Sequence, residues 1–408
     1  MEKGAADQHG YRVSLGHLAA GGAALGRLPD GRVLFVDLAA PGDLAEIRIT
    51  EEHRSWARGE LLDILNPGSE RIRPLCPYYG SCGGCGLQHL AYGAQLEEKA
   101  AILCDALSRI GGLRDLQERG PALRIIPSAE YGYRNRVQFH GTAQGAAHGA
   151  AHGAGFKARK SETIIPIEDC PVADAGIRRR LKTGGIIPPA GRDRFTVYSR
   201  GELFLQEGDG RLGRVSILGR DIIMEAGVFF QSNAAMLELL AGELLDIADG
   251  ADPGLALADI YAGVGTFAAL LGDKFKRIDL IEANHAALDL ARINAPGEGN
   301  RFFARRDGDW LRSFLGQTKR GAKQGPSYGF ALADPPRQGL SPGMAAWLAA
   351  SGPPVLAYLS CNPASLGRDS GILAAGGYEL ASLSFYDFYP QTAHIESLAV
   401  FRRPEAAV

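Results

Sequence analysis

The residues of this chain best suited to covalent chemistry lie in the sequence Ser360-Cys361-Asn362-Pro363. The apolar run before them, 354–359, begins at a proline and is β-compatible, so Cys361 is expected just past the end of a buried strand. Open α/β sheets bind their ligands outside that edge. A lone cysteine there could also be a small buried apolar side chain. The motifs around it favour a nucleophile instead.

A second polar motif, Asp334-Pro335-Pro336-Arg337, ends 24 residues before Cys361. It follows the apolar run 328–333, which predicts another buried strand. Together, the two motifs suggest a single catalytic face. What must position them is a sheet of mainly parallel strands.

A glycine loop with Gly263 and Gly265 follows the predicted strand 255–261. Glu282 ends the next predicted strand, and an acid at that place can bind both hydroxyls of a ribose. Such a loop alone would also fit a dinucleotide. Because the third glycine of a dinucleotide site is missing, the loop favours S-adenosylmethionine over NAD.

Four cysteines could bind a metal centre. Cys76, Cys82 and Cys85 lie in a stretch rich in glycine and proline, and Cys170 lies far downstream. Four thiolates from two loops suit zinc or an iron-sulfur cluster, and the spacing leaves both open. Without a metal, four exposed thiols would be prone to oxidation, so we expect a bound centre.

Composition narrows the class of protein. The chain has 408 residues, 46% of them hydrophobic and 22% charged, which predicts a soluble protein of two or three domains. We expect no signal segment and no membrane span, and hence a cytoplasmic protein with reduced thiols.

The net charge is -2, but residues 121–220 hold 16 basic and 9 acidic residues. This surplus, which includes Arg178-Arg179-Arg180, could follow phosphates or be a solvated basic loop.

The chain divides into three expected domains. Short β-rich runs between glycine and proline turns predict an OB-like barrel in residues 1–70. Residues 71–222 form a central α+β domain, with a helix at 88–110 and a low-complexity hairpin tip at 145–155. Residues 223–408 alternate strands and helices, which predicts a Rossmann-like, doubly wound sheet. Its expected elements are 255–261, 267–271, 277–282, 285–293, 328–333 and 355–359.

With these motifs in order, and with His394-Ile395-Glu396 after them, residues 11–402 resemble the RNA uracil-5 methyltransferase family. The chain is most similar to the branch that carries a TRAM domain and a [4Fe-4S] cluster and modifies 23S rRNA. The sequence Asp30-Gly31-Arg32 and the residues after it resemble the TRAM domain itself. Ala262 departs from the family, many members of which have cysteine there.

The resemblance implies a role for each motif. The four cysteines would hold the cluster. The S-adenosylmethionine site and base pocket would be formed by Gln231, Tyr261, Thr266, Glu282 and Asp334. Cys361 would add to carbon 6 of uracil, and Glu396 would later remove the proton from carbon 5. Glu396 could otherwise be a surface glutamate, but it directly precedes the apolar run 397–401.

Other readings of the sequence stay open. We expect a monomer that acts on RNA, 23S rRNA or alternatively tRNA, because the catalytic motifs do not specify the RNA around the base. An adenine amino-methyltransferase also uses Asp-Pro-Pro, but typically with an aromatic residue next, where this chain has Arg337. A non-enzymatic RNA-binding iron-sulfur protein would have no need of both Cys361 and Glu396.

Overall fold

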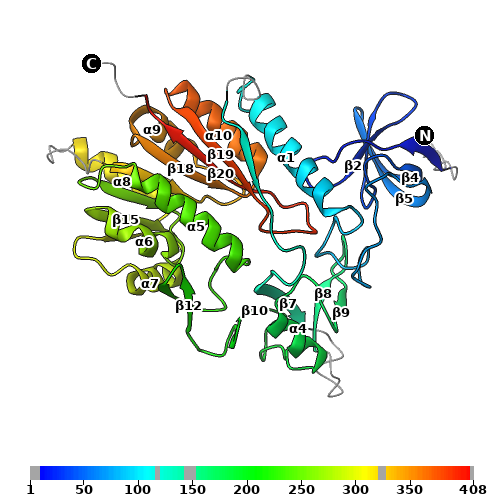
Figure 1. The fold of residues 1–408 in the computed structure, drawn as a ribbon, viewed down its shortest axis with the longest axis horizontal. Coiled ribbons are helices and arrows are strands. Elements are labelled where there is room, and N and C mark those ends of the chain that lie inside the picture. Colours follow the sequence, from blue (N-terminus) through cyan, green and yellow to red (C-terminus); the bar gives the residue numbers. More distant parts are fainter. Residues whose placement is uncertain (1–9, 115–119, 142–152, 320–327, 405–408) are drawn as a thin grey trace, which may run out of the picture. The chain divides into compact units, whose positions relative to one another are not determined.

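The computed structural model describes residues 10–114, 120–141, 153–319 and 328–404 (Figure 1). The chain forms two compact units, and neither is continuous in sequence. The first unit consists of Met1–Ile102, Phe156–Ile165 and Tyr389–His394. The second unit contains the segments between and after these, Leu103–Gly155, Pro166–Phe388 and Ile395–Val408. No helix among the described residues is long and apolar enough to cross a lipid bilayer.

The first unit begins with a five-stranded sheet in the order β1-β4-β5-β3-β2. Its strands are β1 (Tyr11–Ser14), β2 (Ala24–Arg27), β3 (Val33–Val36), β4 (Leu44–Glu52) and β5 (Trp56–Asn66). Next to the outer strands, the Gly16 amide donates to the Leu25 carbonyl at 2.7 Å, which brings the two edges of the sheet together. Alternate residues point inward, including Leu34, Val36, Ala45 and Ile47, all of which are fully buried. The predicted barrel is confirmed.

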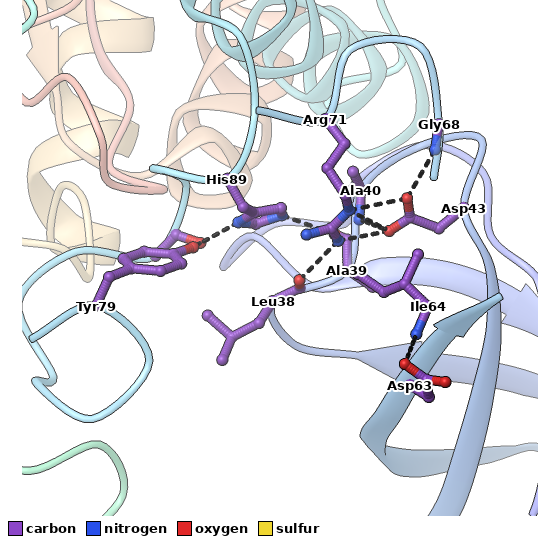
Figure 2. A network of polar contacts seen from close by, with 11 residues as sticks. Leu38, Ala39, Ala40, Asp43, Asp63, Ile64, Gly68, Arg71, Tyr79 and His89 are labelled. Carbon is purple, nitrogen blue, oxygen red and sulfur yellow. Dashed lines mark hydrogen bonds and ion pairs between the residues drawn. The ribbon is translucent and has the colours of Figure 1, made fainter. Parts of the chain in front are cut away.

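A buried polar network ties the barrel to the segment that carries three cysteines (Figure 2). Asp43 accepts hydrogen bonds from the Ala40 amide at 2.7 Å, the Gly68 amide at 2.9 Å and the Arg71 Nε at 3.0 Å. His89 Nε2 lies 3.1 Å from the Ala39 carbonyl. Residues 71–91 are therefore held on the barrel by specific bonds although they form no long helix or strand.

The first unit also contains the start of helix α1 (Tyr92–Arg109), which confirms the helix predicted at 88–110. Its buried face includes Gln95, Glu98 and Lys99, in addition to apolar residues such as Leu103. Glu98 accepts a hydrogen bond from the Leu18 amide at 2.7 Å, so α1 packs on the barrel through a polar contact.

The second unit is built around an eight-stranded sheet in the order β16-β15-β14-β17-β18-β20-β19-β6. The strands are β6 (Leu123–Ile126), β14 (Ala256–Ile260), β15 (Arg277–Glu282), β16 (Arg301–Ala304), β17 (Tyr328–Ala333), β18 (Val355–Ser360), β19 (Glu379–Tyr386) and β20 (Glu396–Arg402). Strands β14 to β18 pair in parallel, and β20 runs antiparallel to both neighbours. Every residue of β14, β17 and β18 is buried, as expected for parallel strands covered on both faces.

Six α-helices connect these strands, namely α5 (Ala234–Asp249), α6 (Thr266–Leu271), α7 (His285–Asn294), α8 (Asp307–Lys319), α9 (Pro342–Ser351) and α10 (Pro363–Ala375), with a 3-10 turn η1 (Gly272–Lys274) after α6. The strand order runs outward from β14 in one direction and from β17 in the other. Right-handed crossovers in opposite directions place helices on opposite faces of the sheet. Consistent with this, α5, α6 and α7 contact in series, as do α8, α9 and α10. The predicted Rossmann-like fold is confirmed.

A smaller sheet in the order β11-β10-β7-β8-β9 and a separate β12-β13 hairpin complete the architecture. Their strands are β7 (Arg136–Gly141), β8 (Ala154–Lys157), β9 (Ile164–Pro166), β10 (Arg194–Arg200), β11 (Leu203–Gln206), β12 (Gly213–Ile217) and β13 (Arg220–Met224), and helix α4 (Ala175–Lys182) packs on β10. Strands β7 and β8 pair antiparallel on either side of the predicted hairpin tip. Most of that tip, residues 142–152, lies outside the described residues. The three-domain division of the chain stays a prediction.

Candidate active site

The predicted nucleophile and base come from two adjacent strands of the large sheet. Cys361 directly follows β18, and Glu396 is the first residue of β20. The last pair in the antiparallel ladder between these strands is Ser360 with Ser397. Cys361 and Glu396 stand one residue beyond that pair on their respective strands, which places them side by side. Asp334 follows β17, the other neighbour of β18, so the three side chains meet at one edge of the sheet.

Asn362 joins the two sequence motifs. Its side-chain amide donates to the Arg337 carbonyl at 2.9 Å, and its side-chain oxygen caps α10 by accepting from the Ala364 amide at 3.0 Å. Pro363 occupies the first turn of α10, where proline is favoured. Cys361 is therefore held between a strand end and a capped helix start.

A pocket of about 20 Å³ lies beside Glu396, the predicted proton acceptor, and has room for about one water molecule. Its polar lining includes Gln231, Asp334, Glu396 and Ser397. The rest of the lining is formed mainly by Leu240, Leu359, Tyr386 and Phe388. Amide and carboxyl groups above apolar and aromatic walls are the usual features of a small-molecule or base pocket.

The Gln231 loop is fixed by neighbouring backbone groups. The Asn135 amide donates to the Ser232 carbonyl at 2.9 Å, and Asn233 donates from its side chain to the Phe388 carbonyl at 3.2 Å. Asn233 also caps α5. These bonds hold Gln231 in the pocket, which Phe388, two residues after the end of β19, also lines.

The thiol of Cys361 is protonated at neutral pH in the absence of ligands. Burial, followed by the charges of Glu396 and Asp334, raises its pKa to about 11, while Arg337 acts in the opposite direction. Both the burial of the thiol and the negative charges nearby therefore oppose formation of the thiolate. A cationic ligand would balance those charges.

Acidic groups are crowded at this edge of the sheet. Burial and then Asp334 raise the pKa of Glu396 to about 8, and burial and then Glu282 raise the pKa of Asp334 to about 7. Burial, Asp334 and Glu282 raise the pKa of Asp259 to about 8. Because these carboxyls disfavour each other's ionised forms, the site as a whole favours a positively charged partner.

The glycine loop crosses the topological switch point between β14 and β17. Gly265 has a φ of 75°, and a Cβ on it would lie 2.9 Å from the Cβ of Ala291 in α7, so only glycine fits. A Cβ on Gly263 would meet nothing within 4 Å. The loop thus packs closely on a helix at one glycine and leaves open space at the other.

Glu282 lies across this loop at the end of β15. One carboxyl oxygen accepts from the Gly263 amide at 2.9 Å and the other from the Asn284 amide at 2.7 Å. Each oxygen keeps a second lone pair, so the predicted ribose contact stays chemically feasible. Thr266 begins α6 and is buried, with 8% of its surface exposed.

Tyr261 has a φ of 67°, which is unusual for a residue other than glycine and marks a strained turn. Burial, and next the neighbouring Asp307, raises the pKa of its hydroxyl. Tyr261 thus lies between the glycine loop and the start of α8.

Two acids near the loop were not predicted as site residues. Asp307 begins α8 just after β16, and its Oδ2 is buried without a hydrogen-bond partner among the described residues. The Oδ2 of Asp259, in β14, has the same property. Because Asp307 follows the carboxyl end of a parallel strand, its place in the chain could have indicated a site residue. No recognisable motif surrounds it, however.

The predicted cluster ligands are divided between the two units. Cys76, Cys82 and Cys85 belong to the first unit and Cys170 to the second. The Gly84 amide donates to the Cys82 sulfur at 3.4 Å, a bond that stabilises thiolate sulfur. Within the described ranges, no three histidine, cysteine or acidic side chains are gathered in a way that could hold a metal ion.

The basic run of α4 is partly engaged within the protein. Arg178 donates to Asp169 at 2.7 Å, and Lys182 lies 3.3 Å from the same carboxyl, which together hold the pKa of Asp169 at about 2. Arg180 stacks on Phe204, with 3.9 Å from guanidinium to ring centroid. The run therefore offers less charge to a nucleic acid than its sequence suggests.

Known proteins resemble the chain along nearly its whole length. Residues 209–403 match the family described as tRNA (Uracil-5-)-methyltransferase, and residues 10–62 match the TRAM domain. An uncharacterised RNA methyltransferase of Treponema denticola is 30% identical, over 94% of this chain and 96% of that protein. The 23S rRNA (uracil(1939)-C(5))-methyltransferase RlmD of Alkalilimnicola ehrlichii is 28% identical, over 92% of each chain.

A solved structure has the same fold. The Pyrococcus abyssi tRNA (uracil-54, C5)-methyltransferase, in complex with S-adenosyl-L-homocysteine, has a TM-score of 0.68 at 22% identity and covers 96% of this chain and 100% of its own. Since the sequence matches extend from the barrel through the large sheet, the chain belongs to the family of RNA uracil-5-methyltransferases that carry a TRAM domain.

Proposed function

We propose that this enzyme methylates carbon 5 of a uridine in RNA through a covalent bond between Cys361 and the base. The observation that carries the proposal is the placement of Cys361 beside Glu396, each one residue beyond the last pair of the β18–β20 ladder. A thiol and a carboxyl at neighbouring positions are the two groups that the reaction requires from the protein.

Cys361 acts first. Carbon 5 of uracil is a weak nucleophile, so the thiolate adds to carbon 6, and the electrons of the 5,6 double bond move toward carbon 5 and oxygen 4. When bound, the cofactor would supply an electrophilic methyl group on a sulfonium sulfur; the sulfur–methyl bond would break as carbon 5 takes the methyl group, and the sulfur would leave as a neutral thioether. Carbon 5 then carries both a methyl group and its original proton.

Glu396 completes the reaction. Its carboxylate removes the proton from carbon 5, the 5,6 double bond forms again, and the bond from carbon 6 to Cys361 breaks to release the thiolate. The raised pKa of Glu396 makes it a stronger base than an ordinary carboxylate once it is ionised. Asp334, which follows the neighbouring strand, contributes negative charge to the same pocket.

S-adenosylmethionine fits the edge of the sheet that holds the glycine loop. Gln231, Tyr261, Thr266, Glu282 and Asp334 would hold it. The open space at Gly263 admits a ligand close to the backbone, and the crowded carboxyls suit a cationic sulfonium. Asp307 adds an acceptor in the place where a nucleobase amino group could donate.

RNA would reach the pocket past Phe229, which is 55% exposed and lies two residues before Gln231. The Arg136 guanidinium lies 5.6 Å from the centroid of the Phe229 ring. An exposed aromatic ring beside a cation is suited to stack an unpaired base. The substrate proposed is 23S rRNA, since relatives that match nearly the whole chain are named as 23S rRNA methyltransferases. Transfer RNA is the alternative.

A [4Fe-4S] cluster held by Cys76, Cys82, Cys85 and Cys170 is part of the proposal. The cysteine sulfurs are the donors that such clusters use, and the Gly84 amide bonded to Cys82 is a typical contact to cluster sulfur. Arg178 is close enough to Cys170 for the thiolate to contribute, after Asp169, to its raised pKa.

The test uses RNA transcripts in which 5-fluorouridine replaces uridine. The wild-type enzyme should form a covalent complex that survives denaturing electrophoresis, because fluorine cannot leave as a proton does. On ordinary RNA, Cys361→Ala should bind cofactor but transfer no methyl group. Glu396→Gln should transfer the methyl group and remain attached to the RNA. Absence of a complex with wild type, or methylation by Cys361→Ala, would refute the mechanism.

The same assay identifies the RNA. Labelled methyl groups from S-adenosylmethionine should enter unmodified 23S rRNA transcripts, and mapping should find 5-methyluridine. If only tRNA transcripts are methylated, the proposed substrate is wrong and tRNA takes its place, while the proposed chemistry stands.

A further inference from the structure

The segment that leads into the proposed base belongs to the first unit, although the residues on both sides of it belong to the second. Tyr389–His394 is assigned with the barrel and the start of α1, and the chain returns to the second unit at Ile395. Glu396 follows immediately as the first residue of β20. Glu396 is paired with Tyr386 of β19, and residues 389–394 are the segment through which the chain enters β20.

Gln391 is bonded on both its backbone and its side chain. Its carbonyl accepts hydrogen bonds from the Gly86 and Leu87 amides, each at 3.0 Å. Its amide donates to Gln95 Oε1 at 3.0 Å, and Gln95 Nε2 donates in return to Gln391 Oε1 at 3.0 Å. Gln95 also donates to the Leu90 carbonyl at 2.8 Å. One glutamine of α1 thus ties the 389–394 segment to the chain just after Cys85.

A second attachment fixes the start of the segment. The buried Lys99, one turn along α1 from Gln95, donates to the Tyr389 carbonyl at 3.2 Å. The same carbonyl accepts from the Thr392 hydroxyl at 2.8 Å. The His394 amide donates to that hydroxyl at 3.3 Å, so the segment is a closed turn rather than a loose link.

The backbone of Gln391 requires these contacts to hold its shape. Its φ is 67°, in the left-handed region that residues other than glycine rarely adopt, and only 1% of its surface is exposed. A conformation of this kind is strained and persists where its surroundings enforce it. Gln95, with no exposed surface, is the side chain that enforces it here.

We propose that Gln95 and Gln391 are positioning residues for proton removal by Glu396. The inference rests on the function proposed above. Cys361 is held separately, by the end of β18 and the Asn362 cap of α10. Loosening the 389–394 segment should therefore displace the base while leaving the nucleophile in place, so it should slow release of the methylated RNA and spare methyl transfer.

The experiment follows a single turnover on RNA with labelled cofactor. Methylated RNA that is still attached to protein is separated from released product by denaturing electrophoresis. For Gln95→Ala, we expect attachment and methyl transfer at the wild-type rate and release that is slower by tenfold to about 100-fold, the effect of misplacing a catalytic group by an ångström. Alanine is the best helix former, so α1 itself should persist.

Matched variants separate positioning from general damage. Glu98→Ala removes a buried side chain of the same helix that bonds Leu18 instead of the 389–394 segment, so release should stay normal. Gln391→Gly keeps the left-handed backbone without strain, and release should slow far less than in Gln391→Val, whose branched side chain opposes that φ.

The outcomes distinguish this inference from the proposed function. If wild type forms no complex with 5-fluorouridine RNA, the covalent mechanism fails and the positioning role fails with it. If wild type forms the complex but Gln95→Ala releases product as fast as wild type, only the positioning role is wrong. Equal losses of methyl transfer and release in Gln95→Ala would also overturn it, because they would indicate general disruption.

Discussion

At the scale of single residues, the balance of charge around Cys361 limits the proposed reaction. Cys361 and Glu396 must each lose a proton before they can act on the uracil ring. Burial and acidic neighbours raise the pKa of both groups. The positive charge of Arg337 lowers the pKa of both groups. The arginine of the Asp-Pro-Pro-Arg motif would thus help activate nucleophile and base together.

We predict that Arg337→Met moves the ascending, acid-side limb of the rate profile to higher pH. Removing the positive charge raises the pKa of Cys361 and of Glu396, and both act in the deprotonated form. The rate at neutral pH should therefore fall and recover as the pH rises. Since Arg337 is exposed, the shift should be about half a pH unit to one unit. Single-turnover methyl transfer and release, measured from pH 6 to 10, check this.

Arg337→Lys is the matched control, because it keeps the charge. Its profile should stay close to that of wild type. If Arg337→Met lowers the rate by the same factor at every pH, Arg337 binds RNA and does not tune the two pKa values.

At the scale of elements, the join between the barrel and the cysteine segment depends on Asp43 (Figure 2). Burial opposes its ionisation, but hydrogen bonds from Arg71, Gly68 and Ala40 outweigh that effect and lower its pKa. The bonds to the ionised carboxyl therefore stabilise the fold above the ordinary pKa of aspartate, and this contribution is lost as the pH falls through the lowered value.

Asp43→Ala should destabilise the first unit by about 3–5 kcal/mol, because it leaves the largely buried Arg71 without its anion and two amides without their acceptor. Thermal unfolding and hydrogen exchange in residues 38–45 and 66–72 measure the effect. Asp63→Ala is the control. Asp63 is exposed and accepts only from the adjacent Ile64 amide, so its loss should change little. Equal effects of the two substitutions would contradict the role of Asp43.

The elements that the sequence predicted best are those buried on both faces. Strands β14, β17 and β18 are mainly apolar, with Asp259 as the one acid in β14, and the motifs after them stand out because polar residues follow directly. Strand β2 carries little sequence signal, since Ala24-Leu25-Gly26-Arg27 offers neither an apolar run nor β-branched residues. Asp307 was missed because it is a single acid without a motif.

The buried face of α1 could not be predicted in full from its periodicity. Leu103 and Leu107 are buried as the apolar stripe requires, but so are Gln95, Glu98 and Lys99. Two of these polar side chains bond Gln391 and Tyr389, nearly 300 residues away in the chain. A periodic pattern contains no information about partners at that separation, so polar residues of this kind are assigned to solvent.

At the scale of the whole molecule, the two units are interleaved along the chain. Residues 156–165 and 389–394 return to the first unit from within the second. The first return bonds the cysteine segment, since the Gly83 amide donates to the Lys157 carbonyl at 3.0 Å. The last return precedes the proposed base. Folding of the cysteine segment and completion of the active site are therefore expected to be coupled.

The proposed iron-sulfur cluster should be detectable in the purified protein. Protein purified without oxygen should be brown and contain iron and acid-labile sulfide. Cys85→Ser should lose both, because a hydroxyl is a poor substitute for a thiolate ligand. S-adenosylmethionine binding, measured by calorimetry, should be affected much less, since the glycine loop and Glu282 lie in the second unit. Cys104→Ser, which changes a half-buried cysteine of α1, should keep its iron. One zinc and no iron in the wild type would refute the cluster, and equal loss of cofactor binding in a folded Cys85→Ser would refute the separation of the two sites.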